Sequence, residues 1–255
     1  MDRMEAPANW LLGAPECPGV TASAFGDADR KWLQKQALGL FAAALLLLLV
    51  FENSRLDLTI SALAFDPGKG RFPWERHWFF SDLMHHGMKT ASYVFALPAL
   101  ALALLGWRRR IDWLPPHNAR LAIFGMLLIP LVTVALKHLS NRHCPWDILD
   151  FGGYAPYLSL FASTPESIVR GVCFPSGHAS GGFVWIVWGL ALRVTRPVLA
   201  KRMLLGALLL GMVMGLARLM QGAHFISHVL WSAWLAWALA IALAAVLRAP
   251  VVAKA

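Results

Sequence analysis

Long apolar runs separated by short basic or polar segments make up most of the chain. Six of these runs are long enough, with their flanks, to cross a bilayer as helices. They lie at about 37–51, 90–107, 119–136, 178–192, 203–220 and 226–247. The pattern predicts an all-α, polytopic membrane protein built as a bundle of six transmembrane helices.

Two longer segments between the runs have a different pattern. Residues 52–89 are more polar and carry five aromatic side chains between positions 72 and 80. Aromatic residues at this density are typical of an amphipathic outer segment that lies at the level of the lipid headgroups. Residues 138–175 form a long loop that also contains aromatic residues, a length that is typical of a functional loop such as a lid.

These patterns divide the chain into three parts. Residues 1–29 lack hydrophobic periodicity and the basic-then-apolar pattern of a signal peptide, so we expect a flexible cytoplasmic tail. Residues 30–248 form the six-helix membrane domain. Residues 249–255 form a second, short cytoplasmic tail.

Composition supports a membrane protein and changes how the charge is interpreted. Hydrophobic residues make up 58% of the chain and charged residues only 15%, which is too apolar for an ordinary soluble domain. The formal net charge of +9 would also suit a nucleic-acid binder. In an apolar chain, however, such an excess more often reflects lysine and arginine on cytoplasmic loops. We therefore expect the bilayer, and no nucleic acid, as a partner.

The distribution of positive charge orients the bundle. Fourteen of the 23 lysine and arginine residues fall on the two terminal segments and the loops around 108–120 and 193–202. The positive-inside rule then places both termini in the cytoplasm, in a bacterial inner membrane. It also places Lys137, His178 and Arg218, together with His224, at the outer, periplasmic ends of four different spans. Ionisable residues gathered at one membrane face indicate a functional site.

The stretch Phe174-Pro175-Ser176-Gly177-His178 stands immediately before an apolar run. A helix that begins here presents free backbone N–H groups and the positive end of its dipole, and glycine allows a ligand to approach the backbone closely. Such a helix start binds anions. We expect the other cationic and imidazole side chains of the outer face to converge on the same anion.

This stretch, followed by Arg218-x5-His224, resembles the second and third motifs of the type 2 phosphatidic acid phosphatase family. The resemblance implies a six-helix lipid phosphate phosphatase. The family's first motif is Lys-x6-Arg-Pro, and here Lys137 is followed by Arg142 two residues early, with Cys144 directly before Pro145. In the third motif, position 228 holds a histidine where the family has an aspartate.

The resemblance also implies a role for each matching residue. His224 attacks phosphorus and becomes a phosphohistidine, because a neutral imidazole is a competent nucleophile near neutral pH. His178 protonates the leaving oxygen, and His228 orients His224, with Asp147 or a backbone carbonyl as the alternative. No metal or other cofactor is required. Five residues bind the phosphate: Lys137, Arg142, Ser176, Gly177 and Arg218.

The substrate implied by the resemblance is a phospholipid or isoprenoid-lipid phosphate or diphosphate, and the oligomeric state stays open. A lipid phosphotransferase would use the same phosphohistidine, and no residue separates it from a phosphatase. A metal or haem protein is a different alternative, since His224-x3-His228 is also a metal-ligand spacing. That alternative leaves Lys137 and Arg218 unexplained, and a non-catalytic structural or transport role remains a further one.

Several other residues carry weaker expectations. We expect His85 and His86 to be structural, and Gly211-x3-Gly215 to allow close helix packing within the chain. Cys17 is expected to be cytoplasmic and unpaired. Cys144 and Cys173 both lie outside, where an oxidising compartment would favour a bridge between them, although free thiols are nearly as compatible with the sequence.

Overall fold

The computed structural model describes residues 25–253, and every regular element in this range is a helix. Most of the expected 1–29 tail, including Cys17, lies outside the described residues. The long and short α-helices are α1 (Asp27–Glu52), α2 (Leu56–Ala62), α3 (Met88–Trp107), α4 (Pro116–Leu139), α5 (Gly177–Phe183), α6 (Ile186–Ala191), α7 (Pro197–Met220) and α8 (Ile226–Val246). A π-helix, η1 (Phe79–Gly87), precedes α3, and two short 3₁₀ helices, η2 (Pro145–Asp147) and η3 (Leu149–Phe151), follow α4.

Between residues 25 and 253, five helical stretches are long and apolar enough to cross a membrane. They are α1, the continuous η1–α3 helix, α4, α7 and α8, with lengths of 21 to 29 residues. A helix needs about 20 apolar residues to cross the hydrocarbon core, so each of them suffices. The protein is therefore an integral membrane protein with an all-helical fold.

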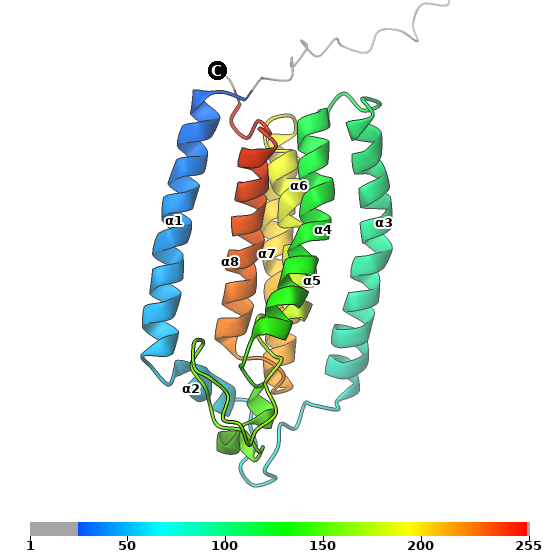
Figure 1. Ribbon diagram of the computed structural model, residues 1–255. Coiled ribbons are helices and arrows are strands. Elements are labelled where there is room, and N and C mark those ends of the chain that lie inside the picture. The colour runs from blue at the N-terminus through cyan, green and yellow to red at the C-terminus, as the bar shows by residue number, and fades with distance from the viewer. Residues whose placement is uncertain (1–24, 254–255) are drawn as a thin grey trace, which may run out of the picture.

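The span expected at 178–192 differs from the other five. It is divided into α5 and α6 by a turn at Val184 and Trp185. Nearly all of its side chains are buried, and it packs against α4, α7 and α8 in the middle of the bundle (Figure 1). The expected count of six spans is thus not confirmed, since the structure shows five long helices and one divided central segment.

Glycines bring the central helices into very close contact. A Cβ atom on Gly182 of α5 would lie 2.4 Å from the backbone of Gly211 on α7, and one on Gly215 would lie 2.4 Å from Val229 on α8. Only glycine leaves room for such an approach. The intramolecular role expected for Gly211-x3-Gly215 is confirmed, and this packing fixes α5 against α7.

The two flanking helices, α1 and α3, stand on opposite sides of the central helices (Figure 1). Few of their side chains are buried, and large apolar residues such as Leu38, Phe41, Phe95 and Leu97 are exposed. Apolar surface of this kind is satisfied by lipid tails. The fold therefore presents two helices to the bilayer and keeps its core in α4 to α8.

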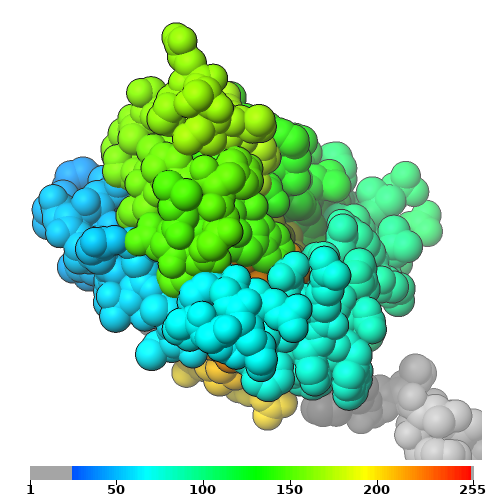
Figure 2. Space-filling model, turned by 90° about the horizontal axis from the view of Figure 1, so that it is seen from below, coloured from blue at the N-terminus to red at the C-terminus, as the bar shows by residue number. Residues whose placement is uncertain are grey.

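We call the end of the bundle formed by α2 and residues 140–176 the loop end. Figure 2 views it from outside and shows the 140–176 loop beside the segment that contains α2. Phe65, Phe72 and Phe151 pack together where the two meet, with ring centroids 5.1 to 5.4 Å apart. The amphipathic outer segment expected at 52–89 is present only in part, because its last residues, from Phe79 onward, extend the second span.

The opposite end of the bundle, which we call the terminal end, joins the two ends of the described chain. Backbone N–H groups of Val251 and Val252 donate to the Asp29 carboxylate at the start of α1, at 2.7 and 2.9 Å. Ala249 and Val251 are fully buried there. The expected 249–255 tail is therefore packed against the bundle over its first residues, and both described ends lie on one side.

Candidate active site

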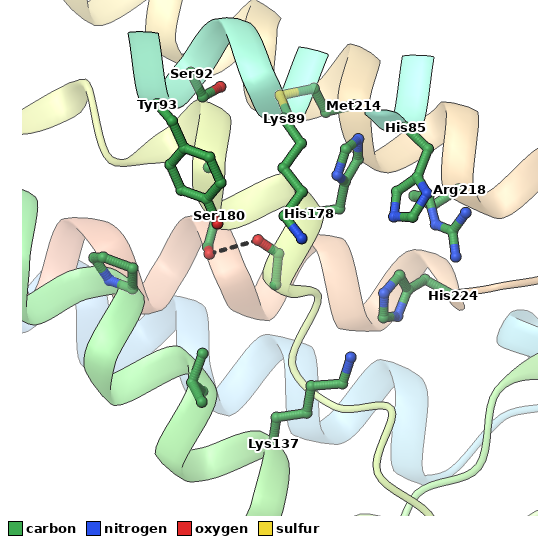
Figure 3. A pocket seen from close by; sticks show the side chains of 14 residues that line it. His85, Lys89, Ser92, Tyr93, Lys137, His178, Ser180, Met214, Arg218 and His224 are labelled. Atoms are coloured by element: carbon green, nitrogen blue, oxygen red, sulfur yellow. Dashed lines mark hydrogen bonds between the residues drawn. The ribbon is translucent and has the colours of Figure 1, made fainter. Parts of the chain in front are cut away.

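A cavity of about 310 Å³ opens among the helices near the loop end. Its lining comes from η1, α3, α4, α5, α7 and the turn between α7 and α8 (Figure 3). Five of the eight site residues expected from the sequence line it: Lys137, Gly177, His178, Arg218 and His224. Lys137 and His224, which are 87 positions apart in the chain, thus line the same cavity.

Arg218 and Lys137 supply positive charge to this cavity. Arg218 lies in the last turn of α7, where its guanidinium donates to Gln221 Oε1 at 2.6 Å and sits 5.6 Å from the Trp146 ring centroid. Lys137 lies in the last turn of α4. Among the described residues neither cation is ion-paired, and no carboxylate lines the cavity. Such a site attracts an anion.

His178 is held in a defined orientation by α5 and η1. Ser176 caps the start of α5 through its hydroxyl, which accepts from the Ala179 N–H at 3.4 Å. His178 Nε2 lies 2.9 Å from the backbone carbonyl oxygen of Met84. Because a carbonyl oxygen only accepts hydrogen bonds, Nε2 carries a hydrogen. Nδ1 is then the nitrogen that is left to exchange a proton with a ligand.

His224 reaches the cavity because α7 ends in a tight turn. Gly222 adopts a left-handed conformation with φ of 73°, and the Ala223 N–H donates to the Arg218 carbonyl at 2.9 Å. His224 Nδ1 lies 3.5 Å from both Cys173 Sγ and His228 Nδ1, which leaves Nε2 for a ligand. Burial lowers the pKa of His224 well below its usual value, and the positive charges of Lys137 and Arg218 lower it further. The imidazole is therefore neutral near pH 7.

His228 lies behind His224 and does not line the cavity. It is fully buried in the first turn of α8, with its ring 5.3 Å from the ring centroids of Phe174 and Phe225. Its Nδ1 faces His224 Nδ1, as an orienting group would, although at the long distance of 3.5 Å. His228 therefore contacts His224 without contacting a ligand in the cavity.

One comparison with known proteins bears on these residues. Residues 118–250, from the first turn of α4 to just beyond α8, match the family described as the PAP2 superfamily. The chain belongs to the PAP2 superfamily. No curated protein and no solved structure matched the chain. PAP2 members are phosphatases, so the family supports a membrane enzyme that hydrolyses phosphoric esters.

Arg142 lies within the PAP2 segment but not at the cavity. The chain leaves α4 after Leu139 and turns the Arg142 side chain toward α1 and α2, where only 2% of the residue is exposed. Its guanidinium lies 2.8 Å from Glu52 Oε1 and 3.4 Å from Asp57 Oδ2. The phosphate contact expected for Arg142 is absent from this arrangement, because the partly buried Glu52 and the fully buried Asp57 already balance its charge.

Ser176 is the other expected phosphate ligand that the structure places elsewhere. Its backbone N–H donates to the His228 carbonyl at 3.2 Å, and its hydroxyl caps α5. Its own carbonyl accepts from the Ser232 hydroxyl at 3.0 Å. These bonds fasten the start of α5 to α8, so Ser176 holds Gly177 and His178 in place. Of Ser176 and Gly177, only Gly177 lines the cavity.

Two basic residues that line the cavity outside the PAP2 segment were not predicted from the sequence. His85, expected to be structural, lines the cavity with its ring 5.0 Å from that of His178, and Lys89 enters the same space from the first turn of α3. Lys89 stands at the outer end of an apolar run, as Lys137 does. The same charge-placement argument applied to Lys89 would have identified it.

A metal alternative is centred on Cys173, His224 and His228, whose possible ligand atoms lie within 4.8 Å of one another. Cys173 is bonded to Cys144 in a disulfide, which was one of the two states the sequence left open. A thiolate is the form of cysteine that binds metals, and a disulfide sulfur is not one. While the bridge is formed, this group offers two histidines and no thiolate.

Proposed function

We propose that this PAP2 protein is a phosphatase that acts on a lipid phosphate or diphosphate at the periplasmic face of a bacterial inner membrane. The observation that carries the proposal is the convergence of Lys137, Gly177, His178, Arg218 and His224 on one cavity at the loop end. Three cationic or N–H donors and two differently oriented imidazoles are the groups that phosphoryl transfer requires.

In the first step, His224 Nε2 attacks phosphorus. An N–P bond forms, and the bond from phosphorus to the leaving oxygen breaks with its electron pair staying on that oxygen. His178 enters this step as the imidazolium, protonated on both nitrogens. It delivers the Nδ1 proton to the leaving oxygen and becomes neutral, while Nε2 keeps its hydrogen on the Met84 carbonyl. Lys137, Arg218 and the Gly177 N–H stabilise the charge on the phosphoryl oxygens in the transition state.

In the second step, water replaces His224 on phosphorus. Neutral His178 takes a proton from the water as it attacks, which regenerates the protonated acid for the next cycle. The N–P bond breaks, inorganic phosphate leaves, and His224 returns to its neutral form. The lowered pKa of His224 supports this cycle, because the released imidazole does not hold a proton near pH 7.

The membrane placement follows from the two ends of the bundle. The terminal end carries the arginine-rich α3–α4 and α6–α7 connections, which the positive-inside rule assigns to the cytoplasm. The loop end then faces the periplasm, and α5 with α6 makes the sixth crossing. A lipid phosphate in the outer leaflet has its headgroup at the depth of the cavity.

Purified protein should release inorganic phosphate from at least one member of a panel of lipid phosphates and diphosphates. We expect release to continue with a metal chelator present and to stop with vanadate, because the cavity uses imidazoles and cations. His178→Ala is expected to slow release about a hundredfold or more, the usual contribution of a general acid. If wild-type protein released phosphate from no member of the panel, the proposed function would be contradicted. Inhibition by the chelator would favour the metal alternative.

A further inference from the structure

Lys89 has no role in the mechanism above, although it lines the same cavity as His178 and His224. It lies in the first turn of α3, directly after η1. The Met84 carbonyl of η1 is bonded to His178 Nε2, and the His85 and His178 rings lie 5.0 Å apart, so this region is fastened to α5. Figure 3 shows the Lys89 side chain extended from α3 into the cavity.

The cavity holds more positive charge than one phosphoryl group needs. Lys89, Lys137 and Arg218 all line it, and within the described part of the chain no carboxylate pairs with any of them. A phosphate monoester carries a charge of about −2 near neutral pH, which two cations balance. A third cation in the same space favours a ligand with a further negative charge.

The position of Lys89 indicates where that charge belongs. In an in-line displacement, the nucleophile and the leaving oxygen lie on opposite sides of phosphorus. His178 Nε2 is bonded to the Met84 carbonyl of η1, so its ring lies on the side of the cavity nearer η1 and α3, where Lys89 also lies. In Figure 3, Lys137 and His224 lie on the other side of the cavity. Because His178 serves the leaving oxygen, Lys89 is on the leaving-group side. It therefore faces the atoms attached beyond that oxygen.

Resting on the proposed function, we propose that Lys89 forms a second anion subsite that binds the inner phosphate of a lipid diphosphate. His224 attacks the terminal phosphorus, the bridging P–O bond breaks, and the electron pair passes to the departing lipid monophosphate. Lys89 balances the charge that grows on this leaving group. The site then prefers lipid diphosphates to lipid monophosphates, whose leaving oxygen is attached to carbon and offers Lys89 no anion.

The test compares a diphosphate and a monophosphate of the same lipid, in neutral detergent without other anionic lipid. We expect Lys89→Met to lower kcat/KM for the diphosphate about tenfold to a hundredfold, as for one lost hydrogen bond between charged groups. The loss for the monophosphate should be clearly smaller, so the preference for diphosphate falls. Lys89→Arg should keep the preference. Lys201→Met, on the exposed first turn of α7 at the terminal end, is the matched control and should behave like wild type.

Each other outcome overturns the subsite. An equal loss for both substrates would make Lys89 a general contributor to the charge of the cavity, and no loss for either would make it a membrane anchor. If added anionic phospholipid altered monophosphate turnover in wild type but not in Lys89→Met, Lys89 would bind a neighbouring headgroup. Failure of the proposed function itself is distinct, because wild-type protein would then release phosphate from neither substrate.

Discussion

His224→Ala is expected to remove phosphate release almost completely. The substitution deletes the nitrogen that attacks phosphorus in the proposed mechanism. Neither His178 nor His228 can replace it, since the mechanism assigns His178 to the leaving oxygen and His228 does not line the cavity. Losses of at least about three orders of magnitude in kcat follow the removal of a catalytic nucleophile. The initial rate of phosphate release from the best lipid substrate, per mole of folded protein, measures the effect.

Three further variants show whether the loss is specific to His224. His138→Ala, at an exposed site one residue after Lys137, should leave the rate unchanged. His228→Ala should lower the rate less than His224→Ala, because His228 contacts Nδ1 of His224 and not Nε2, the nitrogen proposed to attack phosphorus. His228→Asp should keep or raise the activity, since aspartate also accepts the hydrogen bond. Substantial turnover by folded His224→Ala would rule out His224 as the nucleophile.

Arg142→Ala should destabilise the fold, whereas a phosphate ligand would affect only activity. The variant leaves Glu52 and Asp57 without their cation in a site where Asp57 is fully buried. Removing one partner of a buried ion pair costs about 3–5 kcal/mol. The midpoint of thermal unfolding of the purified protein should therefore fall clearly. The fall should be smaller at acid pH, because protonated carboxyl groups no longer need a counter-ion.

Arg55→Ala is the matched control for this effect. Arg55 also pairs with a carboxylate, Asp150 at 2.9 Å, but its side chain is 78% exposed. Exposed ion pairs contribute little to stability, so the unfolding midpoint should scarcely change. If Arg142→Ala kept its stability and instead raised KM for the lipid phosphate, Arg142 would be a substrate ligand after all.

Much of the fold follows from the sequence because membrane helices are specified locally. A helix in lipid satisfies its own backbone hydrogen bonds, so an apolar run of sufficient length is enough to predict it. The packing of the divided segment is harder to predict, since it includes the close approach of Gly182 to Gly211 of α7. Such contacts between distant segments have no signature in the run itself.

The candidate site also has a part that the sequence predicts and a part that it does not. Span parity alone predicts that Lys137, His178 and Arg218 lie at one face, and all three line the cavity. The surroundings of Arg142 could not be predicted in this way, since its burial depends on Glu52 and Asp57, which are 90 and 85 positions away. The sequence shows that the position of Arg142 departs from the family spacing. It does not show that the Glu52 and Asp57 carboxylates form ion pairs with Arg142.

Lys89 and His85 were missed for a different reason. Both belong to a segment that the aromatic residues assigned to the membrane surface, whereas the structure continues the second span through η1 and turns both side chains into the cavity. A π-helix often marks a functional position in a helix, but its presence is a property of the backbone. Only the three-dimensional structure shows that residues 79–87 form a π-helix.

In the proposed mechanism, a substrate phosphoryl group is bonded to His224 during turnover, inside the cavity at the loop end. The most direct measurement is to mix the protein briefly with a lipid phosphate labelled in its terminal phosphate, quench in alkali and map the label by peptide mass spectrometry. We predict label on His224, and none when the same peptide comes from His224→Ala. Label on another residue, or rapid turnover with no labelled protein at any time, would contradict the account.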